Sequence, residues 1–370
     1  GLYFVINYET CFHIIMMSKK EKVIIIAGSI ITGFAAFLYY TKANSVLAFI
    51  VTAGALATLA MIVGDATEHL GKRTGPGVTG ILQSALGNLP ELFVCIFALR
   101  AGLDHVVKAA LIGSILGNSV LVLGFALFVG GLKNGKQKFN SAAPKMIVTL
   151  MILAFAAMAM PTLAKELHTA ASLHLRNLDI VVAIVLLVVL IANMYFSIKG
   201  DRSLTPSSSG DEDAQEKPWS LTLTLIVLAC SGAAAAFVSD WFVVALEPAM
   251  KSLGINEVFA GLVIVAIAGN AIENYVGINL AYKNKADYSV SVILNSSLQI
   301  ALGLYPVLVL LSLFMGGAVL SFVLSPLLLA SLALAVIVSA FIVFDGEFVW
   351  MEGLALIGLY IIIAVAFWWG

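Results

Sequence analysis

The chain has 370 residues, of which 61% are hydrophobic and only 11% are charged, and its mean hydropathy is +1.05. A soluble domain carries about 25% charged residues, so this composition excludes an ordinary soluble protein. The formal net charge of −1 gives no basis for nucleic-acid binding. The three cysteines, Cys11, Cys95 and Cys230, are an odd number and do not predict a disulfide framework.

Long apolar runs follow one another along the chain, and the charged residues cluster between them. A helix needs about 20 apolar residues to span a bilayer, and runs that are continuous rather than alternating indicate helices instead of a β-barrel. The fold class predicted is therefore an all-α polytopic membrane protein with about eleven transmembrane helices. The predicted spans are residues 22–40, 45–70, 75–100, 106–131, 144–162, 178–198, 219–248, 256–282, 287–314, 319–344 and 349–369.

Two segments stand apart from these spans. Residues 1–17 are apolar but interrupted by polar residues, lack the basic start and cleavage site of a signal peptide, and are assigned as an N-terminal extension. Residues 200–218 form an acidic linker, predicted to be cytoplasmic, which is either a flexible connection or a segment that gathers cations near a pore mouth. The predicted division is then a first helix at 18–43, a five-helix repeat at 44–199, the linker, and a second five-helix repeat at 219–370.

Lysine and arginine predict the orientation. If the amino terminus is cytoplasmic, 14 of the 20 Lys and Arg residues fall on the cytoplasmic side. Cytoplasmic loops of membrane proteins carry such an excess, so we expect a cytoplasmic amino terminus. The sequence does not distinguish a cell membrane from an organelle membrane.

A short motif occurs twice inside apolar runs, as GNLPE at residues 87–91 and GNAIE at residues 269–273. An offset of 182 relates the two copies, and the same offset carries Ser114 to Ser296. A carboxylate at a helix centre in the bilayer costs about 2.5–3.5 kcal/mol or more, so paired glutamates indicate function. Because each repeat has five spans, the two repeats insert in opposite orientation, as in transporters whose site lies near the midplane.

Helix breaks are expected at both motifs. Proline removes a backbone donor, so Pro90 is predicted to bend the helix beside Glu91. The second copy has no proline, so its break must depend on Gly269 and Asn270. Non-helical backbone at membrane depth is tolerated where it lines a cavity or is buried in protein, and its carbonyl groups then become oxygen ligands.

The motif residues predict an all-oxygen cation site. The candidate metal ligands are Glu91, Glu273, Asn88 and Asn270, and Ca²⁺ takes 6–8 oxygen ligands in irregular geometry. Two carboxylates balance one divalent charge, and after the cation leaves they favour protonation because two anions in a low dielectric repel each other. Glu91 and Glu273 are therefore also the candidate proton-coupling residues, with cation and protons competing for the same oxygens.

Other polar residues are candidates for the ion path or for supporting the ligands: Gly87, Gly269, Ser114, Asn118, Ser296, Ser297, Gln299, Glu68 and Asp240. The alternative for the amides and hydroxyls is ordinary hydrogen bonding between helices. The alternative for Glu68 and Asp240 is a solvated helix end. The alternative for the motif glutamates is pairing with a basic group, although no Lys or Arg is predicted within an apolar core.

These residues resemble the calcium/proton exchanger family (CAX) of the cation/calcium antiporter superfamily. The resemblance covers both halves and rests on residues 87–92, 98–102, 113–118 and 123–124, then on 269–273, 283–287 and 296–302, together with the acidic linker. It implies eleven helices, exchange of Ca²⁺ for H⁺ by alternating access, ion and proton binding at Glu91 and Glu273, and movement of the first and sixth spans. This chain differs from the family at two positions: it has Asn274 where relatives typically have histidine, and Asn295 where they typically have glycine.

Competing classes are less well supported by the residues. A sodium/calcium exchanger of the same superfamily is the nearest alternative, since Pro90 before Glu91 resembles its motif, yet Asn88 and Asn270 stand where hydroxyls complete sodium sites. An intramembrane enzyme is disfavoured because neither His-Glu-x-x-His nor Gly-x-Ser-x-Gly occurs. A channel would need a continuous polar path. No cofactor is expected; the partners predicted are Ca²⁺, protons and the lipid bilayer, and the oligomeric state is not determined by the sequence.

Overall fold

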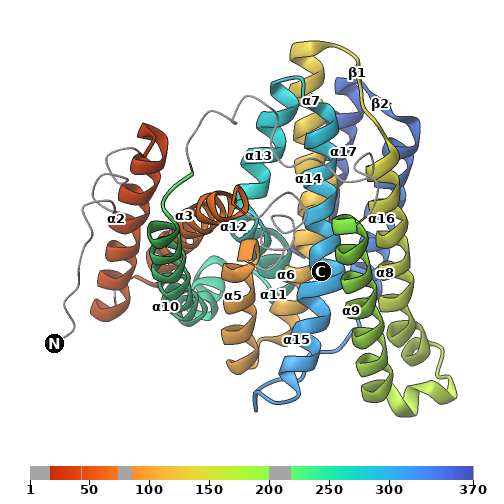
Figure 1. Cartoon of the computed structure of the whole chain (residues 1–370). Coiled ribbons are helices and arrows are strands. Elements are labelled where there is room, and N and C mark those ends of the chain that lie inside the picture. The colour runs from red at the N-terminus through yellow and green to blue at the C-terminus, as the bar shows by residue number, and fades with distance from the viewer. Residues whose placement is uncertain (1–16, 43, 74–85, 200–217, 370) are drawn as a thin grey trace. The chain divides into compact units, whose positions relative to one another are not determined.

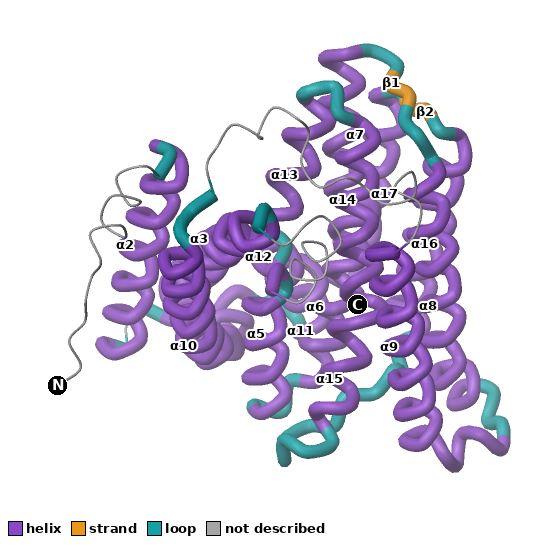
Figure 2. The backbone as a smooth tube through the Cα atoms, viewed as in Figure 1, coloured by secondary structure: helices purple, strands orange, loops and turns teal. Residues whose placement is uncertain are grey.

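The computed structural model describes residues 17–42, 44–73, 86–199 and 218–369 (Figure 1). The N-terminal extension up to residue 16 and residues 200–217 of the acidic linker lie outside this part of the chain. The described residues are almost entirely helical, which confirms the predicted all-α class (Figure 2). The helices of the first half are α2 (Lys19–Thr41), α3 (Ser45–Gly71), α5 (Leu89–Arg100), α6 (Asp104–Leu116), η1 (Gly117–Val122), α7 (Leu123–Asn134), α8 (Ala142–Glu166), η2 (Ala170–His174) and α9 (Leu175–Lys199).

The second half continues in the same manner and adds one pair of short strands. Its helices are α10 (Leu221–Leu253), α11 (Glu257–Phe259), η4 (Ala260–Val265), α12 (Ala266–Gly269), α13 (Ala271–Tyr282), α14 (Ala286–Gln299), η5 (Ile300–Leu304), α15 (Tyr305–Ser312), α16 (Pro326–Asp345) and α17 (Trp350–Trp369). The strands β1 (Gln137–Lys138) and β2 (Glu347–Phe348) pair antiparallel, with Gln137 opposite Phe348.

Within the described residues, nine helical segments are long and apolar enough to cross a membrane, and the bent pair from Glu257 to Tyr282 makes a tenth if it is one span. Ten of the eleven predicted runs therefore have a helical counterpart, and the remaining run, 75–100, lies partly outside the described residues. The protein is accordingly a multi-pass helical membrane protein.

One predicted run begins too early. The run at 319–344 was expected to be helical throughout, but residues 318–325 are non-helical and α16 starts only at Pro326. Proline favours the first position of a helix because its missing N–H is not needed there, and Ser325 caps this helix by accepting a hydrogen bond from the Leu328 amide. Apolar character alone did not distinguish this buried non-helical segment from the helix that follows it.

The chain forms two compact units, and each unit draws on both halves of the sequence. The first consists of Gly1–Val94 with Ser208–Ala249. In it α2 packs along α3, and aromatic pairs join both helices to α10: Phe49 stacks on Phe242 at 5.0 Å between ring centroids, and Tyr39 stacks on Trp241 at 5.5 Å. Stacked aromatic rings bury large apolar surfaces, so these contacts fix α2, α3 and α10 as one bundle.

The second unit consists of Cys95–Ser207 with Met250–Gly370. Here α7 packs against α13 and α17, α16 packs against α8, and α15 packs against α9. The backbones of helix α6 and the π-helix η4 lie in direct contact. A Cβ atom added to Gly113 would collide with the Leu262 backbone, and one added to Gly261 would collide with the Val106 carbonyl. Glycine is required at such a close approach.

Two π-helices interrupt corresponding helices of the second unit. The segment η1 covers Gly117–Val122 and η5 covers Ile300–Leu304, and the offset of 182 carries 117–122 to 299–304. π-Helical turns are rare and often occur at functional sites, because they rotate the side chains that follow them. The matching positions agree with the predicted repeat.

Candidate ion-binding site

The two glutamate motifs fold in the same local way. Asn88 lies in a turn, after which α5 begins at Leu89 and carries Glu91 in its first turn. Asn270 lies between α12 and α13 with φ −104° and ψ 23°, and Glu273 lies in the first turn of α13. The helices on the two sides of the second break are bent by 64°. The predicted helix breaks are therefore confirmed at the motif asparagines.

The predicted role of Pro90 needs correction. The break falls before this residue, at Asn88, and Pro90 is the second residue of α5. The first turn of a helix does not use its amide hydrogens within the helix, so proline fits there without bending it. Pro90 thus follows the interruption instead of producing a bend beside Glu91, which explains why the second motif is interrupted without a proline.

In the first unit, Asn88 and Glu91 are both buried, with 7% and 1% of their surfaces exposed. Glu68 lies near the end of α3 and pairs with Lys72 at 2.9 Å, with its side chain 42% exposed. That geometry matches the solvated helix end considered above. Asp240 is half-buried on α10.

In the second unit, four of the predicted polar residues form one buried network. The Asn118 side-chain amide donates to Asn270 Oδ1 at 3.0 Å and to Ser296 Oγ at 2.9 Å. The Asn270 amide in turn donates to Ser114 Oγ at 2.8 Å and to the Ala266 carbonyl at 2.8 Å. The network joins η1, α14, α6 and the break before α13, so it fixes the orientation of both amides.

This network leaves an oxygen without a donor. Both hydrogens of the Asn118 amide are used, and its Oδ1 has no hydrogen-bond partner among the described residues although the side chain is fully buried. Buried polar atoms in proteins are nearly always paired, so a buried oxygen without a donor is a candidate to bind a water molecule or an ion. Glu273 Oε2 is likewise buried without a hydrogen-bond partner in the described part of the chain. Glu273 lies three residues after Asn270, in the first turn of α13.

The remaining candidates have smaller roles in the geometry. Ser297 donates to the Ile115 carbonyl at 3.3 Å, which is a bond between helices. Gln299 is half-buried at the end of α14, and Gly87 and Gly269 are half-buried where the preceding helical turns end. Among the residues that the structure describes, no three His, Cys, Asp or Glu side chains gather. A cation site in this part of the chain therefore needs amide, hydroxyl or backbone oxygens as well.

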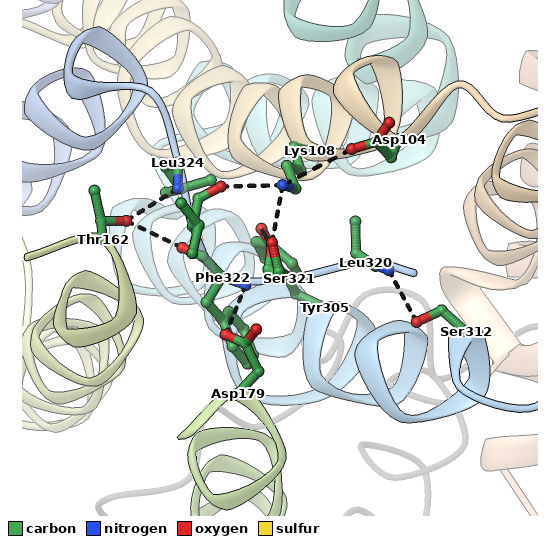
Figure 3. A network of polar contacts seen from close by, with 11 residues as sticks. Asp104, Lys108, Thr162, Asp179, Tyr305, Ser312, Leu320, Ser321, Phe322 and Leu324 are labelled. Carbon is green, nitrogen blue, oxygen red and sulfur yellow. Dashed lines mark hydrogen bonds and ion pairs between the residues drawn. The ribbon is translucent and has the colours of Figure 1, made fainter. Parts of the chain in front are cut away.

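Sequence reasoning missed a second buried polar cluster. No Lys or Arg was expected within an apolar core, but the Lys108 side chain on α6 is only 11% exposed. Its ammonium donates to Ser321 Oγ at 3.0 Å and to the Val323 carbonyl at 3.1 Å, both in the non-helical segment 318–325 (Figure 3). The sequence did contain a signal for this cluster: Lys108 and Asp179 are charged residues near the starts of the apolar runs at 106–131 and 178–198.

The same segment is bound from three further helices (Figure 3). Asp179 on α9 accepts a hydrogen bond from the Phe322 amide at 3.0 Å. Thr162 on α8 bonds to both the Phe322 carbonyl and the Leu324 amide, and on α15 Tyr305 donates to the Ser321 carbonyl. Because buried backbone groups need partners, these side chains replace the bonds that a helix would supply. The cluster explains how residues 318–325 remain non-helical inside the unit.

The fold and the buried polar residues at each interrupted helix define the class as a multi-pass helical membrane protein. Comparison with protein families makes the assignment specific: the family described as sodium/calcium exchanger protein matches residues 44–199 and 223–369. The chain belongs to this family.

Its relatives within the family extend over nearly the whole chain. A Ca²⁺/H⁺ antiporter of Aphanothece halophytica is 36% identical over 341 residues, covering 88% of this chain and 90% of the relative. The Ca²⁺/H⁺ antiporter ChaA of Bacillus subtilis is 34% identical, covering 95% and 99%. The solved structure of native YfkE superposes with a TM-score of 0.80 at 31% identity, covering 95% of this chain and all of that one.

Proposed function

We propose that this protein is a secondary active antiporter that exchanges Ca²⁺ for H⁺ across a membrane. The relatives named as Ca²⁺/H⁺ antiporters support this function, since they are similar at 34–36% identity over most of the chain. The observation that carries it structurally is the buried Asn118 Oδ1, which is held in place by its own amide hydrogen bonds and accepts none. Hard divalent cations prefer such oxygens.

Glu91 and Glu273 are proposed to bind the cation and the protons in turn. Each glutamate lies in the first turn of a helix that follows a motif asparagine. When Ca²⁺ leaves, a carboxylate in a low-dielectric environment is stabilised by taking up a proton. Asn88 and Asn270 are proposed to contribute oxygens or to hold the neighbouring ligands. Asn118 is proposed as a further ligand of the cation. Ser114 and Ser296 are proposed to hold the side chains of Asn270 and Asn118 in their orientations.

Alternating access by two inverted five-helix repeats, at 44–199 and 219–370, is proposed as the transport mechanism. The equal local folding of the two motifs and the matched π-helices η1 and η5 support the repeat. Transporters with such repeats bind their ions at interrupted helices near the membrane midplane.

The amino terminus is proposed to be cytoplasmic because the Lys and Arg residues favour that side. A single cysteine at the exposed Lys138, in a variant whose Cys11, Cys95 and Cys230 are replaced by Ser, tests this. An impermeant maleimide should label Lys138→Cys in inverted vesicles and leave it unlabelled in intact cells. Labelling in intact cells would show that the chain has the opposite orientation.

Ion flux in proteoliposomes tests the proposed exchange. The purified chain is reconstituted, and Ca²⁺ uptake is measured with a proton gradient alone and with a sodium gradient alone. The proton gradient should drive uptake, and a protonophore should abolish it. Uptake that follows the sodium gradient and ignores the protonophore would identify a sodium/calcium exchanger instead.

A further inference from the structure

A cavity of about 610 Å³ lies in the second unit, where α8 ends and where α6, α9 and α16 begin. Its inner wall is the non-helical segment 318–325, with Lys108 and Asp179 beside it (Figure 3). None of the candidate ion ligands lines this cavity. It is therefore separate in its residues from the proposed Ca²⁺ site.

Among the charged side chains of the wall, cationic ones outnumber acidic ones by three to two. Lys108, Lys165 and Arg176 line the cavity together with His105, against the two carboxyl groups of Asp179 and Glu166. Asp179 accepts a hydrogen bond from the Phe322 amide. Lys108 donates to Ser321 and Val323 and also pairs with the Asp104 carboxylate at 3.9 Å. Lys165 and Arg176 are exposed, and neither forms an ion pair with the described residues. Two positive groups are thus available at the rim.

Helix ends add to the positive potential. The cavity is lined by residues from the first turns of α6, α9 and α16, represented by His105, Arg176 and Pro326. The amino-terminal end of a helix carries about half a positive charge, and its free amides bind phosphate and other anions. Because α9 continues directly from η2, only α6 and α16 present a free amino-terminal end here, and these two ends reinforce the charge of the lysines and the arginine.

The surroundings of the cavity are apolar. Leu175, Ile180 and Leu313 contribute to its wall. Leu173 and Phe314, which lie within two residues of these lining positions, expose 82% and 86% of their surfaces. Large apolar side chains are stable in such exposed positions when lipid, and not water, covers them. The cavity therefore combines two cationic groups at its rim with apolar surroundings.

We propose that this cavity binds the phosphate group of an anionic membrane lipid. Arg176 and Lys165 bind the phosphate oxygens, because a guanidinium and an ammonium form charge-assisted hydrogen bonds with phosphate. The apolar wall at Leu175, Ile180 and Leu313 contacts the start of the acyl chains. Free phosphate shares the charged group but not the chains, so the two sources can be separated by measurement.

The test is a lipid titration of the purified full chain in detergent, followed by isothermal titration calorimetry. The probes are dioctanoyl-phosphatidylglycerol, dioctanoyl-phosphatidylcholine and inorganic phosphate. The anionic lipid should bind more tightly than the zwitterionic lipid or free phosphate. The double variant Lys165→Ala/Arg176→Ala should weaken binding of the anionic lipid about tenfold or more, since two charge-assisted hydrogen bonds are lost.

Two controls accompany this variant. The double variant Lys19→Ala/Lys138→Ala removes the same charge from two exposed positions far along the chain and should leave the affinity unchanged. Lys165→Arg keeps the charge and should bind like the parent protein. Equal affinity for the two lipids, or an unchanged affinity in Lys165→Ala/Arg176→Ala, would overturn the site. Tight binding of inorganic phosphate without binding of the lipid would overturn the lipid assignment.

Discussion

At the scale of single residues, each motif glutamate combines a buried carboxylate oxygen with a position at the start of a helix. Glu91 has 1% of its surface exposed, and Glu273 carries a buried oxygen. The amino-terminal end of a helix attracts a carboxylate, whereas burial disfavours its charged form, so a bound cation or proton would stabilise both side chains. The exchange chemistry proposed above depends on these two groups, which the chain repeats after 182 residues.

Replacing either glutamate should abolish proton-driven Ca²⁺ uptake. Glu91→Gln and Glu273→Gln preserve size but remove the exchangeable charge, so uptake in proteoliposomes should fall to the level of empty vesicles. Glu257→Gln is the matched control, because Glu257 lies in the first turn of α11 but is exposed. Near-normal uptake in either buried variant would remove that glutamate from the ion site.

Asn118→Ala should lower the affinity for Ca²⁺ about 10- to 100-fold, in the range found when a metal site loses a contributing group. The variant removes the unpaired Oδ1 and the two hydrogen bonds that hold Asn270 and Ser296. Ser119→Ala is the control, because the Ser119 hydroxyl bonds only to the Ile115 carbonyl of its own helix among the contacts found for it. Calorimetric Ca²⁺ titration distinguishes them; equal affinities would contradict a ligand role for Asn118.

At the scale of elements, the non-helical segment 318–325 depends on side chains from four helices. Apolar residues of this segment, such as Leu320 and Phe322, are buried, so the backbone between them cannot bond to water. Side chains of α6, α8, α9 and α15 supply the missing partners. This arrangement makes the segment a rigid connection between α15 and α16.

Asp179→Ala should destabilise the second unit. The substitution removes the acceptor for the buried Phe322 amide, and a lost hydrogen bond to a charged group costs about 1.5–3 kcal/mol. Asp179→Asn keeps an acceptor oxygen and should be milder. The thermal unfolding midpoint in detergent measures both variants, and identical midpoints for Asp179→Ala and the parent would show that the bond contributes nothing.

The small β1–β2 sheet has a pH-dependent ion pair between Lys136 and Glu347. Its hydrogen bond lowers the pKa of Glu347 and raises the pKa of Lys136. The stability that Glu347 contributes to the folded state is present above the glutamate's unfolded pKa of about 4.3, and it is lost as pH falls through the lower pKa of the folded state. The lysine contribution is present below about pH 10.4 and is lost as pH rises through the higher folded pKa.

Glu347→Gln should therefore lower the thermal midpoint slightly at pH 7. The difference from the parent should shrink as pH falls below the unfolded pKa of about 4.3, and it should vanish only once pH is below the lowered pKa of the folded glutamate. Glu257→Gln, which removes an exposed carboxylate without a described ion pair, is the control. A difference that persists unchanged at low pH would show that the effect does not come from the ion pair.

At the scale of the whole molecule, competition between Ca²⁺ and protons predicts how affinity depends on pH. If both bind the same carboxylates, the Ca²⁺ dissociation constant should rise steadily as pH falls from 8 to 5.5, because protonated carboxyl groups no longer attract the cation. Calorimetry at several pH values measures this, with the ionic strength held constant. An affinity independent of pH would reject direct competition and leave protons to act at a different site.

Much of the fold followed from pattern alone. The apolar runs predicted α2, α3, α8, α9, α10 and α17 to within a few residues, since a bilayer demands about 20 apolar residues whatever the neighbours are. The break at Asn270 was predicted from Gly269 and Asn270. The non-helical residues 318–325 were not predicted, because their apolar side chains look like those of a helix and their polar partners lie elsewhere in the chain.

The sequence by itself determined the membrane class and the repeated motif, and it fixed the chemical type of the proposed ligands, because hydrophobic length and residue identity are local properties. Only the tertiary structure decided which polar groups pair with one another. Ser114 and Asn118 lie on one span, while Asn270 and Ser296 lie on two others, and their hydrogen bonds alone show that Asn118 Oδ1 is the oxygen left over. The partners of a buried amide are set by helix packing, which no local pattern in the chain specifies.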